Sequence, residues 1–129
     1  MNGKVYQVGF ATTQAQYDQA SETLFDALEQ LDKRLGQSRY LHGEDVTLSD
    51  LFLLPTLVRF EAVYEVHFKA NKKPLKAHQN LYRYMLDLVA DERIRSTIDI
   101  DYMKLHYFFS HKHINPNGIV PAGPEIEWI

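Results

Sequence analysis

Histidine is the main ligand-type residue of this chain, which contains 129 residues with six histidines and no cysteine. His106, His111 and His113 lie close together near the C-terminal end. A His-x-His pair can bind zinc or nickel weakly, but no carboxylate or cysteine completes a convincing ligand set beside it. We therefore expect no functional metal site, and a metal-dependent change in thermal melting would test that expectation.

The absence of cysteine limits the chemistry that this chain can supply by itself. It excludes a disulfide, a thiolate metal site and a cysteine nucleophile contributed by these residues. It is also compatible with a reducing cytosol. The chain has eight tyrosines, whose phenols donate hydrogen bonds and whose rings offer stacking faces. Without a further motif, each of them is expected to be a packing residue.

The composition is that of one ordinary globular domain. The chain is 45% hydrophobic and 24% charged, and it is long enough to bury a core. Its net charge of -3 argues against a general nucleic-acid binder, which would be basic. No apolar run reaches the roughly 18 residues that cross a bilayer, and no secretion signal follows Met1. We expect a cytoplasmic protein with no nucleic-acid or membrane partner.

Hydrophobic periodicity indicates the helices that must position these side chains. Residues 1–12 lack that periodicity and are expected to form a non-helical initial segment against the core. From Thr13, a long helix is predicted by apolar residues that recur every three or four positions, and Gly36 is placed to end it in a left-handed conformation. The apolar residues are Tyr17, Ala20, Leu24, Leu28, Leu31 and Leu35.

A Thr-x-x-Asp sequence predicts the start of the second helix. Thr47 can cap the first turn, and Asp50 can accept a hydrogen bond from the backbone N–H of the cap, so both are interpreted as structural. The run 51–58 is apolar nearly all round, which indicates a buried helix. Pro55 within it predicts a bend, and the helix is expected to continue to about Phe68.

Three shorter helices and an irregular tail complete the prediction. Residues 69–78 are basic and contain a proline, which favours a solvated loop. The tail over 114–129 is rich in proline and glycine, and some of its apolar residues are expected to pack on the body. Because strand signals are weak throughout, we predict a single all-α bundle over 1–129. The markers of the three helices are Leu81 with Tyr84, Met85 and Leu88; Glu92 to Ser96; and a cap at Asp99 or Asp101 for a helix through about His111.

The capping motif also carries a family resemblance. The turn Tyr40–Gly43 followed by the cap Thr47–Asp50 resembles the sequence that opens the central buried helix in the C-terminal domain of glutathione transferases. This resemblance implies a glutathione-transferase C-terminal-like helical bundle. Because such domains serve many functions, the motif alone does not define an activity.

Longer segments are similar to one class of that family, the glutathionyl-hydroquinone reductases or Xi class. The similarity runs from Gly3 to Pro124 and includes an Asn-Pro-x-Gly-Ile tail that is unusual outside this class. Two positions depart from the family pattern: Ala70 stands where members often have cysteine, and Glu61-Ala62 where they often have Asp-Pro. Neither position is assigned to chemistry. The other similar segments are Gly3–Thr12, Thr56–Phe60, Val63-Tyr64, His67–Lys69, His106-Tyr107, Ser110-His111 and Ile114–Pro121.

The resemblance implies a two-step thiol exchange with glutathione as co-substrate. A cysteine thiolate attacks the sulfur of a glutathionyl-hydroquinone and releases the hydroquinone, and a second glutathione then yields oxidised glutathione. The family carries that cysteine, and most groups that bind glutathione, in an N-terminal thioredoxin-like domain that we expect to be missing from this chain. The chain alone is therefore expected to be inactive, with its own N-terminal domain as partner and a homodimer as the assembly.

By motif, two tyrosines that the family places beside the cysteine match Tyr6 and Tyr107. A phenol there would donate a hydrogen bond to a ring oxygen of the hydroquinone and stabilise the ring as it takes up a proton. Tyr64 is a further candidate for lining the hydroquinone pocket. Arg59 is expected to make structural hydrogen bonds or a salt bridge.

A non-catalytic protein-interaction module is the alternative, because transferase-like helical domains also serve as docking units. The tail motif and the positions of Tyr6 and Tyr107 argue against it. A thioredoxin-like domain with a cysteine upstream would favour the enzyme. If such a domain covers part of this chain, Val5, Val8 and Phe10 are expected to belong to the covered face, which would promote self-association when exposed.

Overall fold

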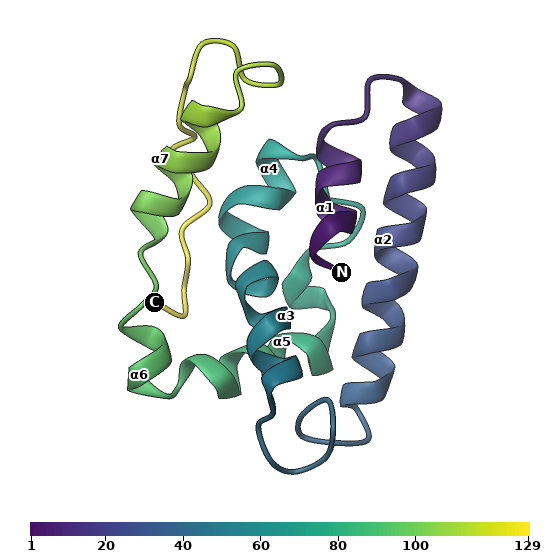
Figure 1. Ribbon diagram of the computed structural model, residues 1–129, viewed down its shortest axis with the longest axis vertical. Coiled ribbons are helices and arrows are strands. Elements are labelled where there is room, and N and C mark those ends of the chain that lie inside the picture. Colours follow the sequence, from purple (N-terminus) through teal and green to yellow (C-terminus); the bar gives the residue numbers. More distant parts are fainter.

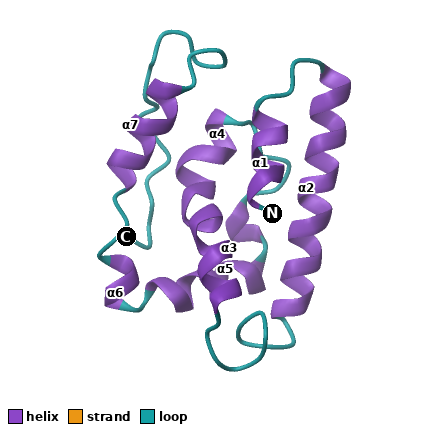
Figure 2. Ribbon diagram, in the orientation of Figure 1, coloured by secondary structure: helices purple, strands orange, loops and turns teal.

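Nine helical segments follow one another along the chain, and no β-strand lies between them in the computed structural model, which describes residues 1–129 (Figures 1 and 2). The predicted all-α class is confirmed. In Figure 1, α1 and α2 lie side by side, α3 to α4 form the middle of the bundle, and α7 lies at the opposite edge from α2. The segments are α1 (Asn2–Gly9), α2 (Gln14–Leu35), α3 (Leu48–Arg59), the π-helical η1 (Phe60–Tyr64), α4 (Glu65–His67), the 3-10 turn η2 (Leu75–Ala77), α5 (Gln79–Val89), α6 (Glu92–Arg95) and α7 (Ile100–Ser110).

The initial segment is helical, contrary to the prediction. Val5 and Val8 are one turn apart in α1 and are only 0% and 2% exposed. The prediction that these two valines form part of an exposed face is therefore wrong, whereas Phe10 is partly exposed at 37%. Gly9 ends the helix against the ring of Phe68, which occupies the space that a Cβ would need. Burial of the valines outweighs the low helix propensity of glycine.

The long second helix has the predicted limits but a different C-terminal conformation. The Thr13 side chain accepts a hydrogen bond from the Gln16 N–H at 3.1 Å, and α2 ends at Leu35. Gly36 has a φ of -75°, so the predicted left-handed conformation is wrong. A Cβ on Gly36 would lie 2.9 Å from Nδ2 of Asn80, which indicates that glycine serves the close approach of α5 here.

The predicted cap of α3 is confirmed, and its Asp50 accepts more hydrogen bonds than the capping motif alone implied. Asp50 is fully buried and accepts hydrogen bonds from the Thr47 N–H at 2.8 Å, the Leu41 N–H at 3.1 Å and the Tyr84 hydroxyl at 2.7 Å. Burial alone would raise the pKa of Asp50, but these hydrogen bonds hold it below its ordinary value. One carboxylate thus joins α3, the Tyr40–Gly43 turn and α5.

The central helix continues past Pro55 and departs from α-helical geometry only afterwards, in η1. There the Glu65 N–H bonds to the carbonyl of Phe60, five residues earlier. The helix resumes as α4 and ends at His67, near the predicted end at Phe68. Because α7 packs on η1, this π-helical segment faces the last helix.

The loop over 69–78 is only partly solvated, because Leu75 and His78 within it are 0% and 1% exposed. The three later helices lie where they were predicted. Asp99, rather than Asp101, caps α7 by accepting a hydrogen bond from the Tyr102 N–H at 3.0 Å.

The tail over 114–129 has no helix, as predicted, and it runs back along α7 (Figure 1). Ile126 is buried, and the indole N–H of Trp128 donates to Glu61 at 3.3 Å. Ile119 and Val120 are exposed, so only part of the tail packs on the body.

Candidate functional site

Three tyrosine hydroxyls from distant parts of the sequence meet between α1, η1 and α7. The Tyr6 hydroxyl donates to the Tyr107 hydroxyl at 3.0 Å, and the Tyr64 and Tyr107 hydroxyls are 3.2 Å apart. The structure therefore brings together all three tyrosines that the sequence resemblance singled out. We call this group the tyrosine cluster.

Aromatic packing fixes the rings of the tyrosine cluster. Tyr64 stacks on Phe68 with the ring centroids 5.2 Å apart and an interplanar angle of 7°. Tyr6 also contacts Phe68, at 5.1 Å, and the ring of Tyr107 meets that of Tyr64 edge to face at 5.8 Å. Tyr64 is buried, whereas Tyr6 and Tyr107 are partly exposed. The two outer phenols are thus the ones that a ligand can reach.

The surroundings of the cluster favour neutral phenols. Burial, together with the hydrogen bond to Tyr107, raises the pKa of Tyr6 to about 12. The same causes raise the pKa of the more deeply buried Tyr64 further. The charge of Arg59 opposes both shifts but does not cancel them. At neutral pH these groups are therefore hydrogen-bond donors and not bases.

A histidine pair lies next to the tyrosine cluster. Nε2 of His67 is 3.0 Å from Nδ1 of His111, and the ring of His111 meets that of Tyr107 at 5.6 Å. Burial, followed by the charge of His111, lowers the pKa of His67 to about 4. His67 was not singled out from the sequence, because it is far from the other histidines along the chain. The only sequence signal for His67 is that it lies in His67–Lys69, one of the segments that resemble the Xi class.

The sequence cluster of histidines is retained only in part, because the rings of His111 and His113 stay 6.0 Å apart. His106 stacks on the exposed Tyr102 at 6.1 Å, whereas His113 packs edge to face on Phe10 at 4.6 Å. No group of three or more His, Cys, Asp or Glu side chains is arranged to hold a metal ion.

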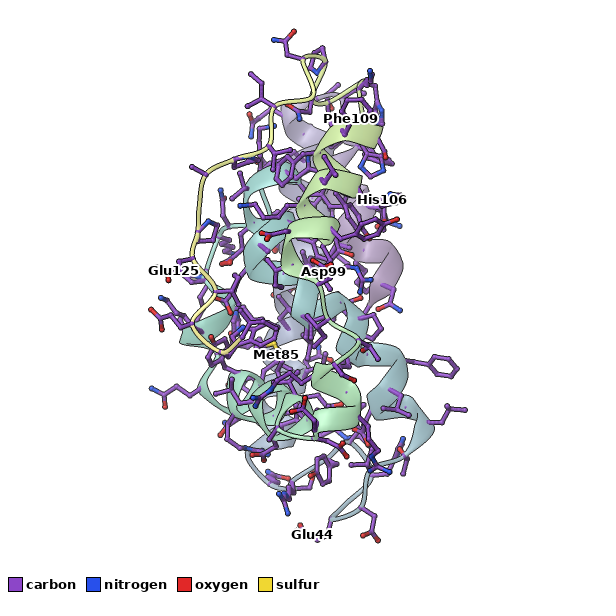
Figure 3. The ribbon with its side chains drawn as sticks, turned by 90° about the vertical axis from the view of Figure 1, so that its left-hand side faces the viewer. Glu44, Met85, Asp99, His106, Phe109 and Glu125 are labelled. Atoms are coloured by element: carbon purple, nitrogen blue, oxygen red, sulfur yellow. The ribbon has the colours of Figure 1, made fainter.

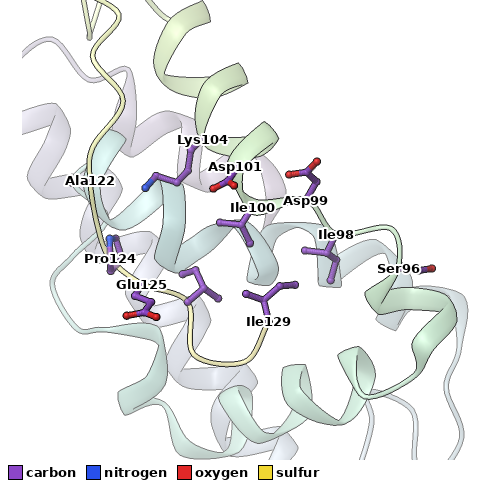
Figure 4. Close-up of a pocket in the computed structure, with 11 residues that line it drawn as sticks. Ser96, Ile98, Asp99, Ile100, Asp101, Lys104, Ala122, Pro124, Glu125 and Ile129 are labelled. Carbon is purple, nitrogen blue, oxygen red and sulfur yellow. The ribbon is translucent and has the colours of Figure 1, made fainter.

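A separate cleft of about 780 Å³ lies between the first turn of α7 and the tail (Figure 4). Lys104 lines it beside three carboxylates, those of Asp99, Asp101 and Glu125. None of the tyrosines of the cluster borders it. Its surplus of negative charge and the absence of a cluster tyrosine from its walls do not suit the predicted chemistry.

Two outward helix faces carry exposed apolar side chains. On α3, Leu48 and Phe52 are both 64% exposed. On α7, Tyr102, Leu105 and Phe109 are exposed, and Figure 3 shows Asp99, His106 and Phe109 spaced along this helix. Apolar side chains are thus exposed on α3 and α7, whereas the two valines of α1 are buried. No helix combines the length and the apolar composition that crossing a bilayer requires.

Comparison with known proteins defines the class of the chain. Residues 14–86 match the glutathione S-transferase C-terminal domain family. The chain belongs to this family, as the Thr47–Asp50 cap and the helical bundle indicated.

Within the family, the chain is similar to glutathionyl-hydroquinone reductases. It is 44% identical to the glutathionyl-hydroquinone reductase YqjG of Escherichia coli over 124 residues, which are 96% of this chain and 38% of that protein. It is also 44% identical to the reductase PcpF of Sphingobium chlorophenolicum, with 96% and 40% of the two chains covered. The chain thus spans about two fifths of the length of these relatives.

Solved structures of the same class of transferases are also similar to this chain. The glutathione-bound structure of Escherichia coli YqjG superposes with a TM-score of 0.94 at 43% identity, covering 98% of this chain and 41% of that one. The Xi-class transferase of Phanerochaete chrysosporium superposes with a TM-score of 0.93 at 42% identity, covering 99% and 43%. The resemblance to the helical domain of this class is confirmed.

Proposed function

We propose that this chain is the helical domain of a glutathionyl-hydroquinone reductase and contributes the tyrosine cluster to its active site. The convergence of Tyr6, Tyr64 and Tyr107 carries the proposal. It is supported by the similarity of nearly the whole chain to two reductases of that name. Because the chain has no cysteine, the nucleophile would come from a separate thioredoxin-like domain.

The proposed reaction is a thiol exchange in two steps. A cysteine thiolate of the partner domain attacks the glutathionyl sulfur, and a Cys–glutathione disulfide forms while the carbon–sulfur bond breaks. The bonding pair stays on the ring carbon, which takes up a proton to give the hydroquinone. A glutathione thiolate then attacks the mixed disulfide, which releases oxidised glutathione and restores the cysteine thiolate. A reducing cytoplasm would supply the glutathione.

The tyrosines would act on the aromatic half of the substrate. Negative charge develops on the ring when the carbon–sulfur bond breaks, and a neutral phenol stabilises it by donating a hydrogen bond to a ring oxygen. Tyr6 and Tyr107 lie at the exposed side of the cluster, and their hydroxyls would turn from each other toward a ring oxygen when the substrate binds. Tyr64, which is buried behind them, would hold the Tyr107 hydroxyl and complete the wall of the pocket.

The partners of this helical domain would dock on the exposed apolar faces. Phe52 on α3 and Leu105 on α7 are more than half exposed, and burial of such faces stabilises association. We propose the thioredoxin-like domain of the same protein as one partner and a second copy as another, giving a homodimer. Sedimentation of the complete protein tests the dimer, and a monomer at high concentration would contradict it.

The test of the function uses the complete protein that carries this chain. Glutathione-dependent reduction of glutathionyl-menadiol would be compared for wild type, Tyr6→Phe, Tyr64→Phe and Tyr107→Phe. Tyr40→Phe is the matched control, because Tyr40 is a core tyrosine outside the cluster and its hydroxyl makes no hydrogen bond. We expect about 100-fold losses of kcat for Tyr6→Phe and Tyr107→Phe, a smaller loss for Tyr64→Phe and none for the control.

The possible results separate the enzyme from the interaction module. An inactive wild-type protein would contradict the reductase proposal and favour a docking role. Full activity in the Tyr6→Phe and Tyr107→Phe variants would retain the reductase but make both tyrosines packing residues. Circular dichroism of each variant checks that the helices are intact.

A further inference from the structure

A second cleft, of about 310 Å³, lies between α3 and the segment that joins α6 to α7. Its walls are mainly apolar and include Leu54, Val58 and Met103. The charged residues that line it are two arginines, Arg59 and Arg93, and no carboxylate lines it. An apolar cleft of this size with a few polar groups suits a small organic molecule, and two cations favour one with negative charge.

Arg59 is the arginine that is available to a ligand. The side chain of Arg93 is 91% exposed and is already paired with Asp91, with Nη2 and Oδ2 2.7 Å apart. Arg59 is partly buried, and its one side-chain hydrogen bond runs from Nη1 to the carbonyl of Pro55 at 3.0 Å. This is the structural hydrogen bond expected from the sequence, and Arg59 forms none of the four salt bridges of the chain. A guanidinium has five N–H donors, so most of those of Arg59 remain free.

Arg59 also links the cleft to the tyrosine cluster. It is the last residue of α3 and directly precedes η1, which carries Tyr64. Its positive charge acts on the hydroxyls of both Tyr6 and Tyr64, where it opposes the rise of their pKa. Arg59 thus lines the cleft and also places its positive charge near two hydroxyls of the tyrosine cluster.

We propose that this cleft binds a carboxylate joined to an apolar body, and that Arg59 is the residue that pairs with the carboxylate. The planar guanidinium matches a carboxylate with two parallel hydrogen bonds, while the apolar walls hold the attached hydrocarbon. The role of this site in turnover rests on the proposed function. The carboxylate would then belong either to the aromatic ring of the substrate or to its glutathionyl group.

Equilibrium binding to the complete protein tests the site without turnover. The probes are 2-naphthoate, its neutral analogue 2-naphthol, and glutathione. We expect Arg59→Met to weaken binding of at least one carboxylate probe by about ten- to hundredfold relative to 2-naphthol, and Arg59→Lys to restore part of it. Arg95→Met is the matched control, because Arg95 lies on α6 but does not line the cleft. Thermal unfolding of each variant checks that it is folded.

Turnover identifies the source of the carboxylate. If it is on the ring, Arg59→Met lowers kcat/KM at least about tenfold more for a glutathionyl-hydroquinone with a ring carboxylate than for glutathionyl-menadiol. If it belongs to glutathione, KM rises equally for both substrates. Unchanged binding of both carboxylate probes would overturn the site. A protein that turns over neither substrate but binds 2-naphthoate through Arg59 would contradict the reductase proposal and leave the carboxylate site intact.

Discussion

The Tyr84 hydroxyl donates a hydrogen bond of 2.7 Å to the carboxylate of Asp50, across 34 positions of sequence and between two side chains that are both 0% exposed. Asp50 also receives the backbone N–H groups of Thr47 and Leu41. A buried charge is stable only when hydrogen bonds replace its water, so each donor that is lost leaves the carboxylate less compensated. The helix cap is therefore also a tertiary contact between α3 and α5.

Tyr84→Phe should destabilise the chain by about 1.5 to 3 kcal/mol, the range for a hydrogen bond to a charged group. Tyr40→Phe is the matched control, because Tyr40 is equally a core tyrosine, packs on Tyr84 at 6.3 Å, and makes no hydrogen bond through its hydroxyl. Urea unfolding at pH 7 measures both changes. Equal effects of the two substitutions would show that the Asp50 contact does not contribute beyond the packing of the ring.

A second prediction concerns acid sensitivity. The pKa of His67 is lowered from 6.5 to about 4 by burial and by His111, so the folded state binds fewer protons than the unfolded state in this interval. The neutral histidine is fully compatible with folding above pH 6.5, and stability is lost as the pH falls from 6.5 towards 4. The largest slope from one group is about 1.4 kcal/mol per pH unit.

His67→Phe should therefore reduce the loss of unfolding free energy between pH 7 and pH 5. Phenylalanine preserves the ring that packs on Phe108 at 4.5 Å but cannot be protonated. The exposed His106 provides the control substitution, His106→Phe. Urea titrations at the two pH values give the slopes. If the unfolding free energies of wild type and His67→Phe fall by the same amount between the two pH values, the lowered pKa of His67 does not account for the acid sensitivity.

Local patterns in the sequence predicted the parts of the fold that depend on neighbours along the chain. The apolar period from Thr13 gives α2, and the Thr47–Asp50 cap gives the start of α3, because both signals act within one or two turns. Tyr6 and Tyr107 were found only through their family-like segments. No local spacing connects two residues that are 101 positions apart.

The failures arose where tertiary packing outweighed local preference. Gly3 and Gly9 interrupt the apolar pattern of α1, so hydrophobic periodicity alone could not predict the burial of Val5 and Val8. The π-helical segment that aims Tyr64 at α7 likewise has no local sequence signal. The histidine pair was missed for a similar reason, since the contact depends on how α4 and α7 pack.

His78 offers a gain of stability. Both of its ring nitrogens are buried without a hydrogen-bond partner, and burial, followed by the charge of Lys73, lowers its pKa. An unsatisfied buried polar group costs about 1 to 3 kcal/mol, so an apolar side chain of similar size should be better tolerated. His78→Leu is expected to raise the free energy of unfolding by about 1 kcal/mol at pH 7, after the loss of stacking on Phe25 is allowed for.

The control for His78 is His78→Asn, which keeps a polar group but removes the ring. It should be less stable than both wild type and His78→Leu, as measured by urea unfolding. A His78→Leu variant that is destabilised by 1 kcal/mol or more would indicate that the ring nitrogens are satisfied by water.

The two glycines of α1 provide the sharpest test of how the tyrosine cluster is held. A Cβ at Gly9 would overlap the ring of Phe68, which lies against both Tyr6 and Tyr64. Nothing lies within 4 Å of the corresponding position at Gly3. Gly3→Ala should therefore stabilise the helix by about 0.5 to 1 kcal/mol through propensity alone, whereas Gly9→Ala should destabilise the chain by about 1 to 3 kcal/mol through overpacking.

The same pair of variants connects packing to the proposed activity. If Phe68 moves, the Tyr6 and Tyr107 hydroxyls no longer hold their 3.0 Å separation, and turnover of glutathionyl-menadiol by the complete protein should fall about tenfold or more in Gly9→Ala. Gly3→Ala should retain wild-type turnover, because Gly3 has no neighbour in the cluster. Undiminished activity in Gly9→Ala, with its stability lowered, would show that the geometry of the phenols tolerates displacement of Phe68 and that their alignment is set elsewhere.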